Sequence, residues 1–359
     1  MIESAGPWGT GPYQLVEGFS VPGKRSDRVV LEANPHYWDR TRRPRVKRIV
    51  FDNTLSQQEA VELVKTTEGR VDLVSELRPL DTLRVAESPW TKVVKNRRSL
   101  ITVFGLFNMR KVESPWRDVR LRQAVNVAIN REDLIRYAAK GNGVIIPALL
   151  PVASFGYDPA LAPYAFDPGK ARHLLREAGY PDGLALSLIA AEDLEVQATV
   201  VSKMLEQAGF RVALQRFDPI TYNWKTRVPE LDQPPEHQPW DIALVVQSDM
   251  FNFSALEPYG SSMHGGFFDW GSEQPELRQL YEQVVGTVDR ERQHGLLRQM
   301  ERHTHDQAAF LFLYNPIGLY AVNKAVEFAP HGNGMLNLVE LSVTDEHWSV
   351  RKQGAAGQK

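Results

Sequence analysis

The chain has 359 residues, 43% of them hydrophobic, and a chain of this length can bury a substantial core and usually forms two domains. Its 42 basic and 44 acidic residues nearly cancel, which argues against binding nucleic acid through bulk positive charge. The absence of Cys excludes a disulfide scaffold, a zinc–thiolate site, an iron–sulfur cluster and a cysteine nucleophile.

The N-terminal segment MIESAGPWGTGPYQL lacks the basic region and apolar core of a secretory signal. No run of eighteen apolar residues occurs in the chain, so the sequence predicts no transmembrane segment. Two interpretations remain open: the chain is cytoplasmic, or its export segment is missing.

The first hundred residues are typical of short strands joined by tight turns, at Gly9–Phe19 and Arg28–Glu32. Six positive charges then fall within the nine residues Arg40–Arg48, ahead of an apolar strand at Ile49–Phe51. Such a run could contact phosphate or a nuclear-import receptor. We interpret it as a solvated turn, because the remaining charges cancel it.

Helical spacing of apolar residues predicts a series of capped helices. The first covers about Ser56–Glu68, with Ala60, Leu63 and Val64 on one face. A second follows Asp118 and is expected to present Arg117, Arg120 and Arg122 on a charged face. Further predicted helices are capped by Asn130, run from Asp167 to Gly179 and from Asp193 to Ala208, and carry the apolar stripes Leu277–Val284 and Leu296–His303.

Strands alternate with these helices from residue 118 onward. Apolar runs predict them at Leu184–Ala190, around Val212 and Leu214, at Asp241–Val246 and at Phe310–Tyr314. The loop Val228–Pro239 is rich in Pro, Glu and Gln, and the tail RKQGAAGQK is expected to be disordered. This succession predicts an α/β domain with helices packed on a sheet.

Seven motifs in the same order resemble landmarks of the extracellular solute-binding proteins, family 5, which serve peptide and nickel ABC transporters. They are GTGPY, NPHYW, GRVDLV, FNMRKVESPWRDVRLRQAVNVAINRE, FDPGKARHLLREAGYPDG, WDIALVV and AAFLFLYNP with the helix pair before it. Each motif is modest alone, and their order over residues 9–340 carries the resemblance.

The resemblance implies a type II periplasmic-binding-protein-like, two-lobe α/β fold that lacks its N-terminal part. The expected divisions are a β-rich remainder of the first lobe (1–104), a second α/β lobe (105–320), a return to the first lobe (321–350) and a disordered tail (351–359). It also implies a periplasmic or extracytoplasmic location, and an ABC transporter permease as partner.

A peptide or similar small solute is the ligand that the resemblance implies, bound in a cleft between the lobes. In peptide-binding members, an Asp just after the buried strand pairs with the ligand's amino terminus, and Asp249 holds that position here. A carboxylate there would form a charge-assisted hydrogen bond with an ammonium group. Family members commonly continue with a Tyr/Pro/Asp-rich turn, whereas this chain reads MFNFSALEP. The alternative for Asp249 is a turn residue bonded to its own backbone.

Aromatic residues gather near the same position in the sequence. Tyr222, Trp224 and Phe251 could line side-chain pockets, although most rings in this region are expected to belong to the core. Arg227 could meet a ligand carboxylate, with a solvated loop charge as the alternative.

Catalysis, metals and cofactors are not expected. His303 and His305 stand two apart on a predicted helix and so point to different faces, and no GxSxG, HExxH, P-loop or dinucleotide motif occurs. Two other classes stay open: a scaffold subunit that reuses part of the fold, and a cytoplasmic ligand-sensing regulator. A regulator would need a DNA-binding domain, and no helix-turn-helix candidate is visible.

Overall fold

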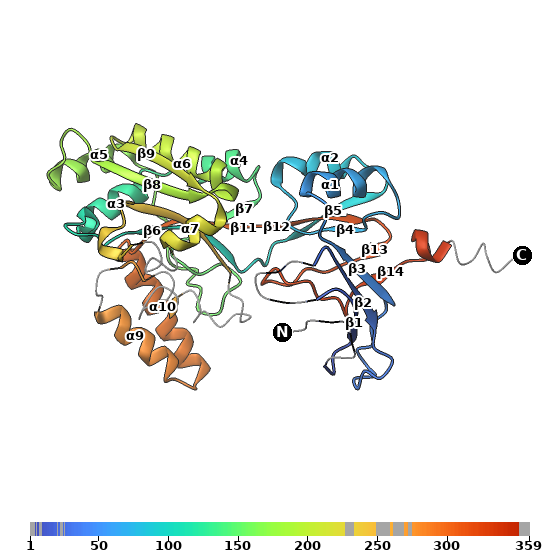
Figure 1. The fold of residues 1–359 in the computed structure, drawn as a ribbon. Coiled ribbons are helices and arrows are strands. Elements are labelled where there is room, and N and C mark those ends of the chain that lie inside the picture. Colours follow the sequence, from blue (N-terminus) through green and yellow to red (C-terminus); the bar gives the residue numbers. More distant parts are fainter. Residues whose placement is uncertain are drawn as a thin grey trace, which may run out of the picture. The chain divides into compact units, whose positions relative to one another are not determined.

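The computed structural model describes residues 4, 6, 9–19, 21, 24, 26–226, 233–248, 259–260, 269–271 and 275–351. The chain divides into two compact units (Figure 1). Unit 1 consists of residues 1–97, 318–331 and 335–359, and unit 2 of residues 98–317 and 332–334. Within the described ranges, no helix is both long and apolar enough to cross a bilayer.

Unit 1 contains three small antiparallel sheets. The first has the order β1-β2-β3 and pairs Leu15 with Leu31, and Leu31 with Ile49. The second has the order β4-β12-β5, with α1 and α2 packed against it, and β13 pairs with β14. The bounds are β1 (Tyr13–Glu17), β2 (Arg28–Ala33), β3 (Arg48–Asp52), α1 (Gln57–Thr66), β4 (Leu73–Val74), α2 (Thr82–Ala86), β5 (Thr91–Asn96), β12 (Gly318–Asn323), β13 (Val326–Glu327) and β14 (Ser342–Val343).

Helix α1 confirms the helix predicted after Ser56, with a correction to its buried face. Ser56 accepts a hydrogen bond from the Glu59 amide, and the Glu59 carboxylate bonds back to the Ser56 amide, so the two form a capping box. Of the predicted face, Val64 is buried, whereas Ala60 and Leu63 are half-buried, and Val61 is the second buried residue. Val61 was not predicted, because the sequence alone does not show which sheet the helix packs against.

Unit 2 is built on one six-stranded sheet of order β7-β11-β6-β10-β8-β9. Strand β10 is parallel to β8 and antiparallel to β6, and β11 is also antiparallel to β6. The bounds are β6 (Ile101–Phe107), α3 (Val119–Val127), α4 (Arg131–Ala138), β7 (Gly143–Ile145), α5 (Pro168–Glu177), β8 (Ala185–Ala191), α6 (Glu195–Gln207), β9 (Arg211–Phe217), α7 (Pro219–Thr226), β10 (Ile242–Ser248), α9 (Pro275–Val285), α10 (Arg290–Asp306) and β11 (Phe310–Pro316).

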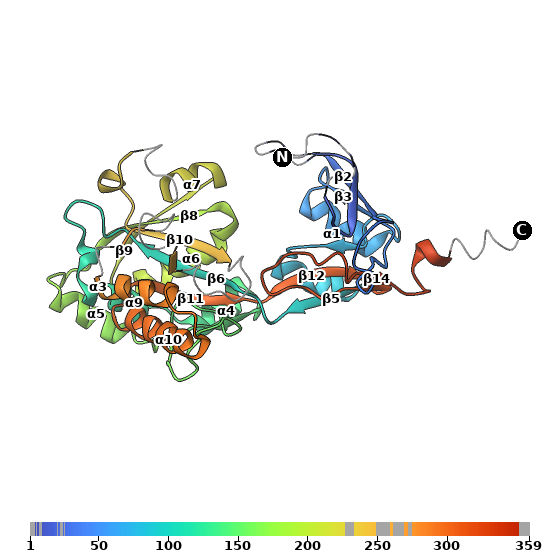
Figure 2. The same cartoon turned by 90° about the horizontal axis from the view of Figure 1, so that it is seen from below.

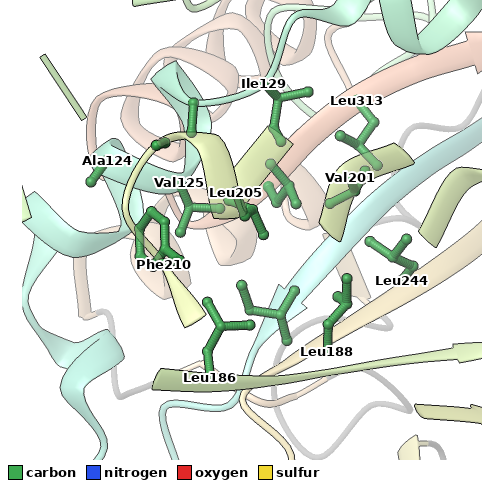
Figure 3. Close-up of a cluster of buried hydrophobic side chains, with 14 of the residues drawn as sticks. Ala124, Val125, Ile129, Leu186, Leu188, Val201, Leu205, Phe210, Leu244 and Leu313 are labelled. Carbon is green, nitrogen blue, oxygen red and sulfur yellow. The ribbon is translucent and has the colours of Figure 1, made fainter. Parts of the chain in front are cut away.

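The sheet of unit 2 separates two hydrophobic cores. Helices α3 to α6 cover one face, where alternate residues of β8 and β10 such as Leu188 and Leu244 meet Val201 and Leu205 of α6 (Figure 3). Helices α7, α9 and α10 cover the other face, which Figure 2 views from the side of α9 and α10. Strand β10 is therefore buried on both faces, as its unbroken apolar run predicts.

Arg122 is the clearest correction to the sequence analysis in this unit. It was expected on a charged face, but only 5% of it is exposed. Its guanidinium donates to the carbonyl oxygens of Trp116, Gln307 and Ala308, at 2.6, 2.7 and 3.2 Å. The side chain thus ties α3 to the turn before β11. Its charge can be buried because backbone carbonyls replace the water that an exposed Arg would bind.

Candidate ligand site

The proposed ligand group, Asp249, directly follows the end of β10, at Ser248. Strands β8, β9 and β11 run in the same direction as β10, so all four finish at one end of the sheet, which we call the β10 edge (Ala191, Phe217, Ser248 and Pro316). Asp249, Phe251 and Arg227 lie outside the described residues. The structure thus defines the strand end that precedes Asp249.

Side-chain hydrogen bonds hold neighbouring segments at the β10 edge. Ser248 Oγ donates to the Asn333 carbonyl at 3.2 Å, and Asn315 Nδ2 donates to the Ser99 carbonyl at 3.0 Å. Thr102, which pairs with Gln247 across the strands, donates to the Leu149 carbonyl at 3.1 Å. These bonds involve five stretches of chain, around residues 99–102, 149, 248, 315 and 333, and so fix this end of the sheet.

Helix α7 carries two of the predicted aromatic contacts. Tyr222 is 6% exposed, and its hydroxyl donates a hydrogen bond to the Leu244 carbonyl in the middle of β10. Its ring therefore packs α7 onto the sheet. Trp224, in contrast, is 48% exposed and has surface available for a ligand.

The last turn of α7 is fixed by two indoles that the sequence analysis did not single out. Trp240 Nε1 donates to the Lys225 carbonyl at 3.2 Å, and Trp270 Nε1 donates to the Thr226 carbonyl at 2.7 Å. Trp240 immediately precedes Asp241 and β10, at the end of the strand opposite the β10 edge. The structure consequently does not bring Trp224 together with Ser248. The sequence signal that could have identified Trp240 is its position just before the buried strand β10.

Glu301 is a buried carboxylate that sequence reasoning also missed. It has 0% exposure and accepts hydrogen bonds from the amides of Leu149 and Leu150, at 3.3 and 3.2 Å, and from the Tyr259 hydroxyl. Burial raises the pKa of Glu301 to about 7, even though these donors act to lower it. Glu301 thus links α10 to the segment around Leu149 and Leu150. Thr102, which pairs with Gln247 of β10, donates to the Leu149 carbonyl of the same segment.

The histidines of α10 do not form a metal site in the described part of the chain, where no group of three or more His, Asp or Glu could hold an ion. The side chain of His303 is 19% exposed, and its Nε2 lies 3.9 Å from a Glu276 oxygen. His305 stacks on Tyr164 with ring centroids 4.4 Å apart. The two rings thus have separate surroundings.

A Ser–His–Asp chain occurs in unit 1, near the C-terminal end. Ser349 Oγ lies 2.8 Å from His347 Nδ1, and His347 Nε2 lies 3.3 Å from an Asp72 oxygen. Trp348 and Asn323 also donate to the same carboxylate, at 3.0 and 3.3 Å. We interpret this cluster as an anchor, because Asp72 is shared among three donors and Ser349 stands two residues from His347.

The fold matches solved periplasmic binding proteins. The chain is similar to a periplasmic binding protein DppA of Helicobacter pylori in complex with the peptide STSA, with a TM-score of 0.73, 18% identity, and coverage of 93% of this chain and 63% of that one. A putative peptide-binding protein AppA of Clostridium difficile gives a TM-score of 0.77 at 15% identity, with coverage of 93% and 67%. The architecture is therefore that of the type II periplasmic binding proteins.

Sequence comparison leads to the family. The profile of the bacterial extracellular solute-binding proteins, family 5 Middle, matches residues 3–233, well over half of the chain. The chain belongs to this family. It is 25% identical to the dipeptide-binding protein of Escherichia coli over 326 residues, and 24% identical to heme-binding protein A of Haemophilus influenzae over 327 residues. It covers 58% and 57% of the lengths of these relatives, and they cover 89% of it.

Proposed function

We propose that the chain belongs to the solute-binding component of an ABC transporter and contributes to the binding of a peptide or a similar small solute. Support comes from membership of family 5, and from relatives whose names include dipeptide-binding and glutathione-binding proteins. On this proposal the protein works outside the cytoplasm with permease subunits as partners. It binds its solute without catalysis, cofactor or metal.

The proposed anchor for the ligand is Asp249, and the observation that carries it is the end of β10 at Ser248. Strand β10 is buried on both faces, and β6 pairs with it as far as Ser248, so the end of the strand is held in the sheet. A carboxylate at this point would bind a ligand ammonium by a charge-assisted hydrogen bond. Phe251 would then contact the adjoining ligand side chain.

Trp224 and Arg227 are proposed for the other end of an extended ligand. Because the last turn of α7 is tied to Trp240 and Trp270, Trp224 lies toward the start of β10 rather than its end. Arg227 would meet the ligand's carboxylate, and the exposed indole of Trp224 would pack on a side chain. Opposite charges at opposite ends favour a zwitterionic ligand.

Titration calorimetry with a mixed pool of short peptides tests the proposal. Asp249→Ala should weaken binding by well over tenfold, because losing one partner of a desolvated charge pair costs on the order of 2–5 kcal/mol. Peptides with an acetylated amino end should bind weakly to both proteins. The matched control is Asp182→Ala, which removes the same charge from an exposed turn before β8, at the opposite end of the sheet.

Equal affinity of wild type and Asp249→Ala, with unchanged circular dichroism, would remove Asp249 from the site. Loss of affinity in the Asp182→Ala control to the same extent would indicate a general effect of charge. If wild type binds no peptide in the pool, the proposal that this chain binds peptides fails.

A further inference from the structure

The connection between β2 and β3 carries a strongly basic and aromatic surface that solute binding does not use. We call it the β2–β3 patch and define it as Trp38, Arg40, Arg43, Arg45 and Lys47. All five side chains are exposed. Trp38 is 72% exposed, more than any other aromatic side chain among the described residues.

The four cations of the patch have no ion-pair partner in the part of the chain that the structure describes. Their basic neighbours do have partners: Arg42 lies 4.0 Å from a Glu340 oxygen, and Arg48 lies 3.4 Å from a Glu32 oxygen. The one acid within the segment, Asp39, instead accepts hydrogen bonds from the Thr41 amide and hydroxyl at 2.9 and 2.6 Å. Within residues 38–47, the unpaired cations of the patch thus outnumber the single negative charge of Asp39.

The patch is also held in shape, which distinguishes it from a solvated tail. Tyr13 donates its hydroxyl to the carbonyls of Val46 and Leu338, at 3.1 and 3.2 Å. At the other end of the connection, Asn34 Oδ1 accepts from the His36 amide at 2.9 Å. The ring of Tyr37 lies 5.7 Å from that of Trp38. A fixed loop presents cations and an indole together at low entropic cost.

We propose that the β2–β3 patch docks unit 1 onto the anionic headgroups of a phospholipid membrane. Lys and Arg near such a surface are attracted by its negative potential, and Trp prefers the level of the headgroups, where its ring is half in apolar surroundings. Nucleic acid also combines with cations and rings, but the family is one of extracellular proteins, which meet lipid headgroups rather than nucleic acid. This inference does not depend on the ligand proposed above.

Co-sedimentation with vesicles tests the proposal. The chain should bind vesicles of equal parts phosphatidylglycerol and phosphatidylcholine, and should not bind pure phosphatidylcholine. Each cation near an anionic membrane contributes about fivefold. Removing four should therefore weaken binding at least about a hundredfold. The variant is R40Q/R43Q/R45Q/K47Q.

The control variant removes four exposed cations from unit 2 and so has the same net charge: K140Q/K170Q/R176Q/R278Q. It should bind the anionic vesicles within about threefold of wild type, since the affinity resides in the patch. Raising the salt from 0.05 to 0.5 M should release the wild-type protein, because screening shortens the reach of surface charges. The indole fluorescence of wild type should shift to the blue on anionic vesicles, and Trp38→Phe should abolish that shift.

Several results would overturn the proposal. They are absence of vesicle binding, equal binding to both vesicle compositions, and equal loss in the two four-residue variants. Binding of soluble polyglutamate as tight as vesicle binding, with no shift of Trp38 fluorescence, would assign the patch to an acidic protein and not to lipid.

Discussion

Arg131 and Arg122 are two buried guanidinium groups whose partners are carbonyl and amide oxygens. Arg131 is 4% exposed and donates to the carbonyls of Phe312, Asn126 and Tyr164, at 2.8, 3.1 and 3.1 Å. Burial lowers its pKa to about 10. Several neutral acceptors thus stabilise the charge, and the planar fork of donors is what lets one side chain reach them together.

Arg131→Lys should accordingly destabilise the protein, although it keeps the positive charge. One ammonium group cannot reach all of these acceptors, so we expect a loss on the order of 2–4 kcal/mol in the free energy of unfolding, measured with urea. Arg136→Lys, on the same helix but with a 66% exposed side chain, is the matched control and should change stability by less than about 0.5 kcal/mol. Similar losses in both variants would show that the hydrogen-bond fork is unimportant.

Glu301 predicts a dependence of stability on pH. Because burial raises its pKa to about 7, the folded protein favours the protonated carboxyl. This contribution is fully present below the ordinary pKa, near 4.5, and is lost as the pH rises through about 7. Glu301→Gln resembles the protonated form, so its stability should fall less than that of wild type between pH 5 and pH 8. The difference should be on the order of 3 kcal/mol.

Urea unfolding at several pH values measures this difference. Glu282→Gln, at an exposed position on the neighbouring α9, is the control and should follow the wild-type curve. Parallel curves for wild type and Glu301→Gln would contradict the raised pKa. The groups that face Glu301 are Tyr259, which donates to it, and Asp158, whose charge raises its pKa while Arg302 pairs with Asp158 at 2.7 Å.

A residue can be predicted from the sequence when its hydrogen-bond partner lies close to it along the chain. Caps such as Ser56, Asn130 and Asp167 bond within three residues, so their patterns can be read directly. Glu301 and Arg122 bond to segments about 150 and 185 residues away. Nothing near them in the sequence distinguishes them from surface charges.

At the scale of elements, the predicted strands and helices of unit 2 were largely found, because apolar periodicity reports burial directly. The strand order was not predictable. Strand β11 lies beside β6, about two hundred residues earlier, and β10 lies between β6 and β8. The position of the proposed site depends on that order. The apolar run predicted β10 as far as Val246, two residues short of its end at Ser248, and it did not predict the neighbours that hold the strand.

The C-terminal segment of unit 1 gives a prediction at this scale. Asp72, just before β4, accepts hydrogen bonds from His347, Trp348 and Asn323, and so anchors residues 344–351 to the sheet. Asp72→Ala should leave three donors without their acceptor and raise amide hydrogen exchange in 344–351 by about tenfold or more. Exchange in unit 2 should not change.

Asp345→Ala is the control for this change, since it removes an exposed carboxylate from the same segment. It should leave the exchange rates of 344–351 within about twofold of wild type. An Asp72→Ala protein with wild-type exchange in that segment would show that its packing alone, without the shared carboxylate, holds it.

At the scale of the whole molecule, each of the two units is assembled from separate stretches of the chain. Unit 1 is assembled from residues 1–97 with later stretches, so that β12 pairs with β4 and β5 across more than two hundred residues. The divisions expected from sequence, at residues 104 and 320, remain predictions about independently folding lobes. Pairing between strands this far apart cannot be predicted from amino-acid composition. The family resemblance is what implied that the chain leaves the first lobe and returns to it.

Limited proteolysis tests these lobes. Unit 2 has its own six-stranded sheet and two cores, so we expect residues 104–320 to stay together as one body after the first cuts. Thermolysin should cut first in the loop Val228–Pro239 and in the tail after Arg351, where the composition is rich in Pro, Glu and Gln or poor in apolar residues. The α5 segment Ala171–Ala178 is the internal control, because it packs Ala171, Leu174 and Leu175 into the core and must unfold before it can be cleaved. Mass spectrometry of the early fragments identifies the cuts, and cleavage within 171–178 as early as in the loop would exclude a compact second lobe.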